Sequence, residues 1–331
     1  MFLKVFRGIG PGVVFLIFLT ASAAWANAFI NPHLGTSFLY DNNPMPLYDI
    51  LKGLIGDSAI TGVIISFILV LLMSFLLVNF NTVTFFINER TFLPAVIYVL
   101  FVGLFPYYQV LNPVLPASVL LMLAIRRIMD AYRKNGIAYN FFDASILISI
   151  GSLFYANLIW FGLLVIIGIA ILRTGNFREL ILAILGFCTP VILITGIYYT
   201  LGKDITSLLS CTRYNLFSDS GMYFFSRLTI TGLVIIGLCS VFSIFYLLTA
   251  LGGKNIKSRK TFTLLLWTVI IALSVYFILP SASVELIYLL AIPLSYFLSN
   301  YLIFSKKKII QEIVFTAILI ITAVFQVMYI W

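Results

Sequence analysis

Residues 139–172 read YNFFDASILISIGSLFYANLIWFGLLVIIGIAIL, and the path of this apolar stretch decides the fold. As one straight helix the stretch would be about 50 Å long, since an α-helix rises 1.5 Å per residue. The hydrocarbon core of a bilayer is only about 30 Å thick. The stretch is therefore too long for one upright crossing, and the alternative is two short helices that turn near residues 151–157.

The composition of the whole chain is typical of a membrane protein with many helical spans. Hydrophobic residues make up 62% and charged residues 9% of the 331 residues, and the mean hydropathy is +1.14. Soluble domains carry about 25% charged residues. The long runs are apolar on all sides, whereas the strands of a membrane barrel would alternate apolar and polar residues. We therefore expect an all-α, polytopic transmembrane bundle that forms a single integral membrane domain over residues 1–331.

Basic residues lie in short clusters at the ends of the apolar runs, and their distribution resolves the ambiguous stretch. If residues 139–172 form two spans and the N-terminus is inside, sixteen of the 20 basic residues lie on the inner side. If the stretch is one span, the two sides carry ten each. An excess of Lys and Arg on the cytoplasmic side is the rule for such proteins. The sequence thus predicts about 11 spans, the N-terminus inside and the C-terminus outside, with spans at residues 11–30, 59–80, 92–108, 112–128, 139–172 (two), 179–200, 224–251, 261–280, 284–304 and 309–331.

Few residues of the chain are suited to hold a metal or a cofactor. The chain has three cysteines and one histidine, and the cysteines are too scattered for a disulfide framework or a metal site. We expect no metal and no cofactor. The net charge of +9 is explained by membrane orientation, so we expect no nucleic-acid partner. The N-terminal run, with Lys4 and Arg7 before it, resembles a signal peptide, but we favour an uncleaved first span.

Two hairpins, at about residues 92–128 and 141–172, are short and interrupted. Pro94, Pro106, Pro113 and Pro116 bracket the turn of the first. Prolines at membrane depth free backbone groups that neighbouring helices or water must satisfy. The hairpins therefore either surround a cavity or pack as a compact core.

On the outer side, acids, amides and tyrosines gather in the predicted loops 31–58 and 201–223, the first of which contains a candidate interfacial helix at residues 47–55. Asp41 and Asp49 are candidate catalytic acids, because a carboxylate can accept a hydroxyl proton. Arg213 is a candidate phosphate clamp, because guanidinium groups bind phosphate in a bidentate manner. The plainer interpretation is an interfacial belt of tyrosines with solvated loop acids. The remaining candidate substrate-binding residues are His33, Asn42, Tyr48, Tyr107, Asn112 and Asn157.

Further charged residues at the ends of the spans are expected to have structural roles. Glu89 and Arg90 are predicted to form a structural ion pair at a membrane boundary. Glu285 and Glu312 each precede an apolar run, where a carboxylate interacts favourably with a helix N-terminus. No acid stands clearly at the middle of a span, which argues against a proton-coupled transporter.

Five segments resemble an uncharacterised family of polytopic inner-membrane proteins of Gram-negative bacteria, over roughly residues 40–200. The resemblance implies a bacterial inner-membrane location and no particular activity. The chain is also loosely similar to membrane glycosyltransferases that use polyprenyl-phosphate sugars, which likewise carry acids in the first external loop. The five segments are FINERTFLP (86–94), LNPVLPA (111–117), YNFFDA (139–144), GSLFY (151–155) and FREL (177–180).

Three functions remain open on this basis, so it stays undecided whether the protein is an enzyme. The first is a non-catalytic inner-membrane component of cell-envelope assembly that works with membrane protein partners. The second is a glycosyltransferase-like enzyme that acts on lipid-linked sugars at the outer face. The third is a transporter or flippase. In each case we expect the lipid bilayer to be a partner, with a lipid-linked sugar or a phospholipid as the candidate ligand.

Overall fold

The computed structural model describes residues 2–8, 10–32, 39–56, 58–132, 139–172, 177–218 and 227–330. These residues form an all-helical bundle, in line with the sequence. Seven of the described helices are long and apolar enough to cross a membrane, and two shorter apolar helices accompany them. The elements are α1 (Phe2–Phe6), α2 (Pro11–Ile30), α3 (Leu39–Asn42), α4 (Pro46–Ile55), α5 (Ala59–Thr84), α6 (Leu93–Gly103), η1 (Pro106–Tyr108), α7 (Val114–Asp130), α8 (Tyr139–Ser152), η2 (Ala156–Phe161), α9 (Gly162–Leu172), α10 (Phe177–Thr200), α11 (Ile205–Phe217), α12 (Arg227–Ala250), η3 (Leu251–Gly253), α13 (Ile256–Ile278), η4 (Val284–Leu286), α14 (Ile287–Phe304) and α15 (Lys308–Ile330).

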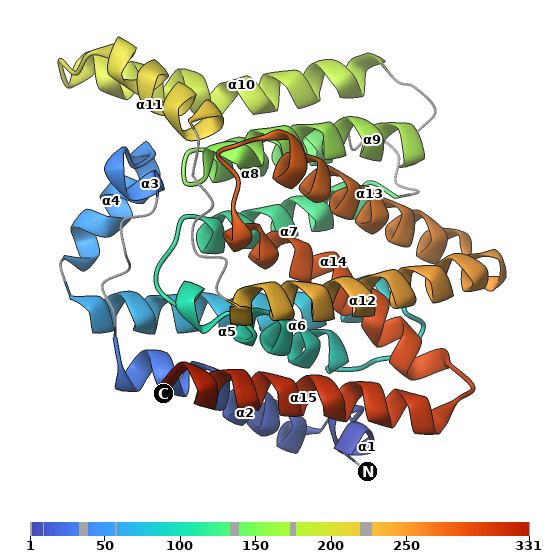
Figure 1. Ribbon diagram of the computed structural model, residues 1–331. Coiled ribbons are helices and arrows are strands. Elements are labelled where there is room, and N and C mark those ends of the chain that lie inside the picture. Colours follow the sequence, from blue (N-terminus) through green and yellow to red (C-terminus); the bar gives the residue numbers. More distant parts are fainter. Residues whose placement is uncertain are drawn as a thin grey trace.

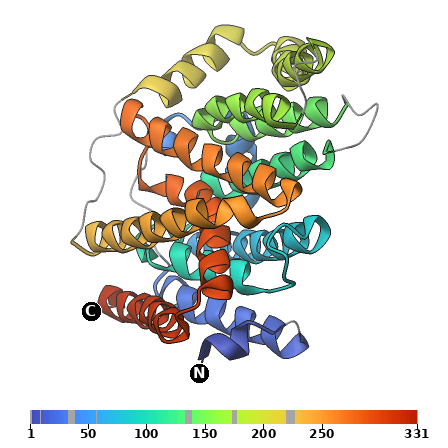
Figure 2. The same cartoon turned by 90° about the vertical axis from the view of Figure 1, so that its right-hand side faces the viewer.

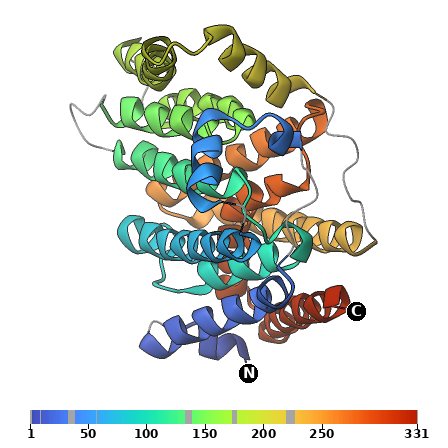
Figure 3. The ribbon, with the colours of Figure 1, turned by 90° about the vertical axis from the view of Figure 1, so that its left-hand side faces the viewer.

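The long helices are stacked side by side, with α2 and α15 at one edge of the stack and α10 at the other (Figure 1). Helix α14 runs obliquely through the middle of this stack, as the view from one end shows (Figure 2). It packs against α6, α7, α12 and α13. The short helices α3, α4 and α11 gather at the left-hand end of the stack in Figure 1, which faces the viewer in Figure 3.

The ambiguous stretch 139–172 breaks into two helices, as predicted. Helix α8 ends at Ser152, and the amide of Tyr155 donates to the carbonyl of Gly151 (2.9 Å), which closes the turn. Gly151 allows the return segment to pass closely, since a Cβ at this position would lie 2.3 Å from Cδ2 of Leu158. The break therefore depends on a glycine at the point of closest approach.

The two predicted hairpins differ in their packing. Every residue of α6 is buried, and both α6 and α7 pack against α5 and α14. The first hairpin is thus part of a compact core. The second hairpin, α8 with η2 and α9, packs against α10 and leaves a cavity on that flank.

The predicted external loop at residues 201–223 contains a helix that the sequence analysis did not anticipate. Helix α11 begins after Asp204, whose carboxylate accepts a hydrogen bond from the amide of Thr206 (3.0 Å). Leu208, Cys211 and Asn215 then follow at helical spacing and are buried. An N-cap and one buried face are enough to form a helix in a segment too polar to be taken for a span. Residues 47–55, predicted to form an interfacial helix, are helical as part of α4.

Candidate functional site

The first candidate acid, Asp41, is part of an ion pair at the end of the bundle where α3, α4 and α11 lie. Its carboxylate lies 2.6 Å from the ammonium of Lys52, and the two side chains are 21% and 42% exposed. The pair joins α3 to α4, and the same ammonium lies over the ring of Tyr48. Tyr40 and Tyr48 pack edge to face beneath it. Asp41 therefore holds two short helices together.

The second candidate acid, Asp49, is exposed on α4. It lies within electrostatic range of Cys211 on α11: burial raises the pKa of the Cys211 thiol, the hydrogen bond from Asn215 opposes this, and the negative charge of Asp49 adds to it. Arg213, on the same helix, is exposed, as is Asn42 at the end of α3. These groups lie on the surface at this end of the bundle, and His33 lies outside the described residues.

Helix α11 is tied to the segment between α3 and α4. The side-chain amide of Asn215 donates to the carbonyl of Asn43 (2.7 Å), and the thiol of Cys211 donates to the carbonyl of Pro44 (3.3 Å). Cys211 also packs against Met45 and Ala156 in a small apolar cluster. Helices α3, α4 and α11 thus form a cap, in which side chains of α11 donate hydrogen bonds to backbone carbonyls of the segment between α3 and α4.

Three of the candidate binding residues have clear roles in the fold. The hydroxyl of Tyr48 donates to the carbonyl of Leu111 (3.3 Å). The side-chain carbonyl of Asn112 accepts from the amide of Leu115 (3.1 Å) at the start of α7, in the manner of an N-terminal cap. Tyr107 packs edge to face on Tyr108.

Asn157, the last candidate binding residue, lies in a buried polar cluster where helix connections meet. Its amide donates to the hydroxyl of Ser281 (3.1 Å) and to that of Tyr155 (3.3 Å). The Ser281 hydroxyl in turn donates to the carbonyl of Leu216 on α11 (2.8 Å). A third connection, residues 104–113, contains Tyr108, whose carbonyl accepts a hydrogen bond from the hydroxyl of Tyr288 on α14 (2.7 Å). We refer to residues 104–113, 153–157 and 279–285 as the turn cluster.

Glu285 lies within the turn cluster and is the functional candidate that the sequence analysis missed. Its side chain is 2% exposed, and the hydroxyl of Ser283 donates to its carboxyl group. Burial raises the pKa values of Tyr40, Tyr108 and Tyr155, and a negative charge on Glu285 would raise them further. These three phenols, together with that of Tyr276, therefore lie within electrostatic range of this carboxyl. The sequence signal was an acid in a serine-containing turn between two apolar runs, PSASVE (280–285).

Glu89 pairs with a different arginine from the one predicted. Its carboxylate lies 3.3 Å from the guanidinium of Arg7, which also donates to the carbonyl of Ile303 (3.0 Å). Arg90 is exposed and is not part of this pair. The pairing ties α1 to the turn before α6 and to the end of α14, and the distance of 82 residues between the partners explains why local sequence did not reveal it.

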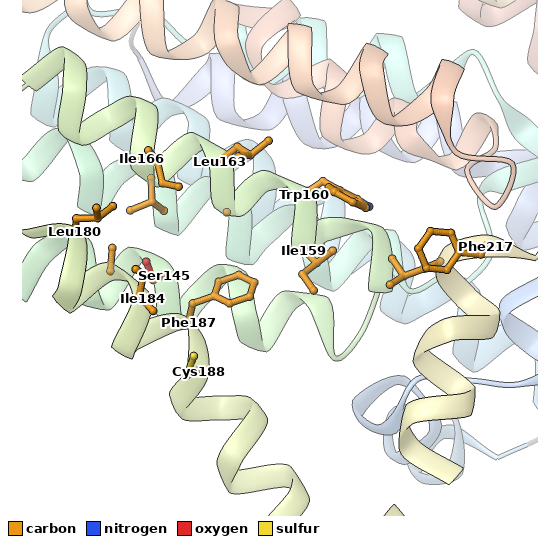
Figure 4. A pocket seen from close by; sticks show the side chains of 14 residues that line it. Ser145, Ile159, Trp160, Leu163, Ile166, Leu180, Ile184, Phe187, Cys188 and Phe217 are labelled. Atoms are coloured by element: carbon orange, nitrogen blue, oxygen red, sulfur yellow. The ribbon is translucent and has the colours of Figure 1, made fainter. Parts of the chain in front are cut away.

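Two large cavities lie between helices and are lined almost wholly by apolar side chains. The first, of about 470 Å³, lies between α8, η2, α9 and α10, with Phe217 of α11 at one end (Figure 4). The second, of about 310 Å³, lies between α12, α13 and α14. A third, of about 10 Å³, lies in the turn cluster between Tyr40, Tyr155, Asn215 and Ser281, among others. Among the described residues, no group of three or more metal-binding side chains is found.

Comparison with known proteins gives a family and no activity. The model of a family of unknown function, DUF6427, matches residues 50–331. This match covers most of the chain. It gives no support to the similarity to membrane glycosyltransferases that the sequence suggested. No curated protein and no solved structure matches the chain.

Proposed function

Since the chain belongs to this family of unknown function, its role has to be argued from its own residues, and we propose that it is a non-catalytic membrane component of cell-envelope assembly. In this proposal it resides in the bacterial inner membrane and works by packing against the membrane helices of partner proteins. The bundle crosses the membrane about 11 times, with the N-terminus inside.

The observation that carries this proposal is the unequal packing of the long helices. Only 17% of the most apolar window of α12 is buried, yet α12 borders the cavity of about 310 Å³ together with α13 and α14. Gly237 and Ser240 line this cavity, and a Cβ on Gly237 would meet no atom within 4 Å. Small residues on an exposed helix face allow close approach of another membrane helix.

The use of the outer polar groups supports a structural role over a catalytic one. Asp41 is neutralised by Lys52, Asn157 bonds to Ser281 and Asn112 caps α7. A general acid or base must face the substrate, whereas these groups face other parts of the chain.

A transporter is the second candidate function, and the turn cluster is the observation that favours it. Non-helical backbone and an acid inside a membrane bundle are features of transport pathways. A hydrated path that opens to alternate sides of the membrane would establish this role in place of assembly.

The test is native mass spectrometry of the gently extracted full-length protein, with Gly237→Trp as the variant. We expect the wild type to carry a partner protein in constant ratio. In Gly237→Trp we expect the partner to be lost and the cell envelope to become defective. The matched control is Gly196→Trp on α10, since Gly196 also has open space at its Cβ position. If Gly237→Trp retains the partner and the cells keep a normal envelope, the α12 interface is refuted. If only lipid is bound in the wild type, the assembly role is refuted.

The predicted orientation has its own test. Reporter fusions after Gly202 and after Gly252 should report the outer and the inner side respectively, because the first follows α10 and the second lies between α12 and α13. The opposite result at either position would refute the orientation.

A further inference from the structure

We propose that Glu285 is a proton-binding site at the outer end of the bundle, where the carboxyl group takes up and releases a proton while it remains inside the protein. The proposal does not depend on the assembly role. It rests on the burial, the neighbours and the position of this side chain.

The first step is the absence of a compensating charge. Glu285 is 2% exposed, and the ion pairs among the described residues involve Asp41, Asp143 and Glu89 instead. Removing a carboxylate from water without a cationic partner is costly, so that such groups are kept neutral by protonation. Its environment therefore accepts the protonated acid.

The second step is the nature of the groups around the carboxyl. Phenols from four parts of the chain lie within electrostatic range of the carboxyl: Tyr40 of α3, Tyr108 of η1, Tyr155 of the turn after α8 and Tyr276 of α13. On its own turn the neighbour is the hydroxyl of Ser283. Phenols and hydroxyls are uncharged at physiological pH, so they supply hydrogen-bonding groups without an opposing charge. A hydroxyl that donates to the carboxyl favours the ionised form, so a proton can also be released.

The third step is a route to the outer surface. Tyr40 and Tyr155, which lie within electrostatic range of Glu285, also line the cavity of about 10 Å³ together with Asn215 and Ser281. This is about the volume that one water molecule needs, and four polar side chains can bind it. Tyr40 is followed directly by Asp41, whose ion pair with Lys52 is partly exposed. Polar groups thus continue from the surface to the carboxyl.

The fourth step is the consequence of proton release. The negative charge would appear within the turn cluster, where side-chain hydrogen bonds between Asn157 and Ser281 join two of the three segments. An unpaired buried charge favours any rearrangement that admits water or a cation. We therefore expect proton release to loosen the turn cluster and the cap formed by α3, α4 and α11.

The experiment is infrared spectroscopy of the purified full-length protein in lipid vesicles over a range of pH. The protonated acid gives a carbonyl stretching band that a carboxylate lacks. We expect this band at neutral pH in the wild type and its loss in Glu285→Gln. The control is Glu312→Gln, which should retain the band. In the wild type the carboxyl of Glu312 accepts a hydrogen bond from the amide of Leu3 at the other end of the bundle (3.2 Å). Ser283→Ala keeps the carboxyl and removes its donor, so the band should persist to higher pH than in the wild type.

Three results would overturn the proposal. One is a wild type without the band at neutral pH, which would mean that Glu285 is ionised there. Another is a band that survives in Glu285→Gln. The third is a band that sodium chloride removes at constant pH while potassium chloride does not, which would assign the site to an alkali cation. Glu285→Gln is uncharged and of equal size, so loss of folding is not expected, and Ser283→Ala provides an independent measurement.

Discussion

Helices α14 and α12 are both apolar and of similar length, but they have opposite relations to the rest of the bundle. In α14, 94% of the most apolar window is buried and its mean hydropathy is 1.7; in α12, 17% is buried and the mean hydropathy is 2.4. The more buried helix is thus the less apolar of the two. A lipid-facing helix must be apolar on its outer side, whereas a buried helix can use polar side chains for hydrogen bonds to its neighbours.

The polar side chains of α14 are indeed bonded within the protein. Tyr288 donates to Tyr108 and Tyr296 donates to the carbonyl of Leu77 (2.8 Å). Near its end, Asn300 accepts a hydrogen bond from the ammonium of Lys254 (2.8 Å). Burial lowers the pKa of this lysine. For these two helices, the higher hydropathy belongs to the more exposed helix and the lower one to the buried helix.

The largest effect expected from this contrast is at Tyr296. Its ring is fully buried and packs against Phe80 and Phe86, so Tyr296→Ala should lower the free energy of unfolding by about 3 kcal/mol or more. Phe245→Ala, on the exposed side of α12 (69% exposed), should change it by less than about 0.5 kcal/mol. Reversible denaturant titration in mixed micelles measures both. Equal effects of the two substitutions would refute the contrast.

A smaller effect is expected where α10 packs against α8. Gly186 lies against α8, and a Cβ there would stand 2.5 Å from the carbonyl oxygen of Phe142. Gly186→Ala should therefore destabilise the protein by about 1–3 kcal/mol, since backbone has to move. Gly196→Ala, further along the same helix with open space around it, should be neutral or stabilising because alanine favours helix. Thermal unfolding followed by thiol labelling compares them, and a loss of stability in Gly196→Ala alone would contradict this account.

How far sequence could lead is clear from particular residues. The break in 139–172 was predictable because basic residues mark which side each connection occupies, and the apolar runs gave the approximate bounds of the long helices. The pairing of Glu89 with Arg7 and the burial of Glu285 among tyrosines from four elements were not predictable. Both depend on contacts between residues far apart in the chain, which local patterns do not record. The match to the family model adds membership and no chemistry.

The smallest effect concerns the cap of the exposed helix α11. Hydrogen bonds from the side chain and the amide of Thr206 lower the pKa of Asp204, so the folded helix binds its proton less readily than the unfolded segment does. The stabilisation is present above the ordinary pKa of an aspartate and is lost as the pH falls through the lowered value. Hydrogen exchange of the α11 amides should therefore accelerate in acid in the wild type, after correction for intrinsic rates. Asp204→Asn should show less dependence on pH over this range, and an unchanged dependence would refute the role of the cap.

The central position of α14 has a further consequence for biosynthesis. Residues 287–304 pack against α6 at residues 93–103, so these contacts span nearly 200 residues of chain. At a synthesis rate of roughly 5–20 residues per second, the earlier helices would wait roughly 10 to 40 s in the bilayer before their central neighbour arrives. During that interval the faces that α14 will cover are exposed to lipid or to other proteins. A stop codon before residue 287 would therefore leave the earlier helices without their central neighbour, so the packing of the whole bundle depends on a helix that is synthesised late.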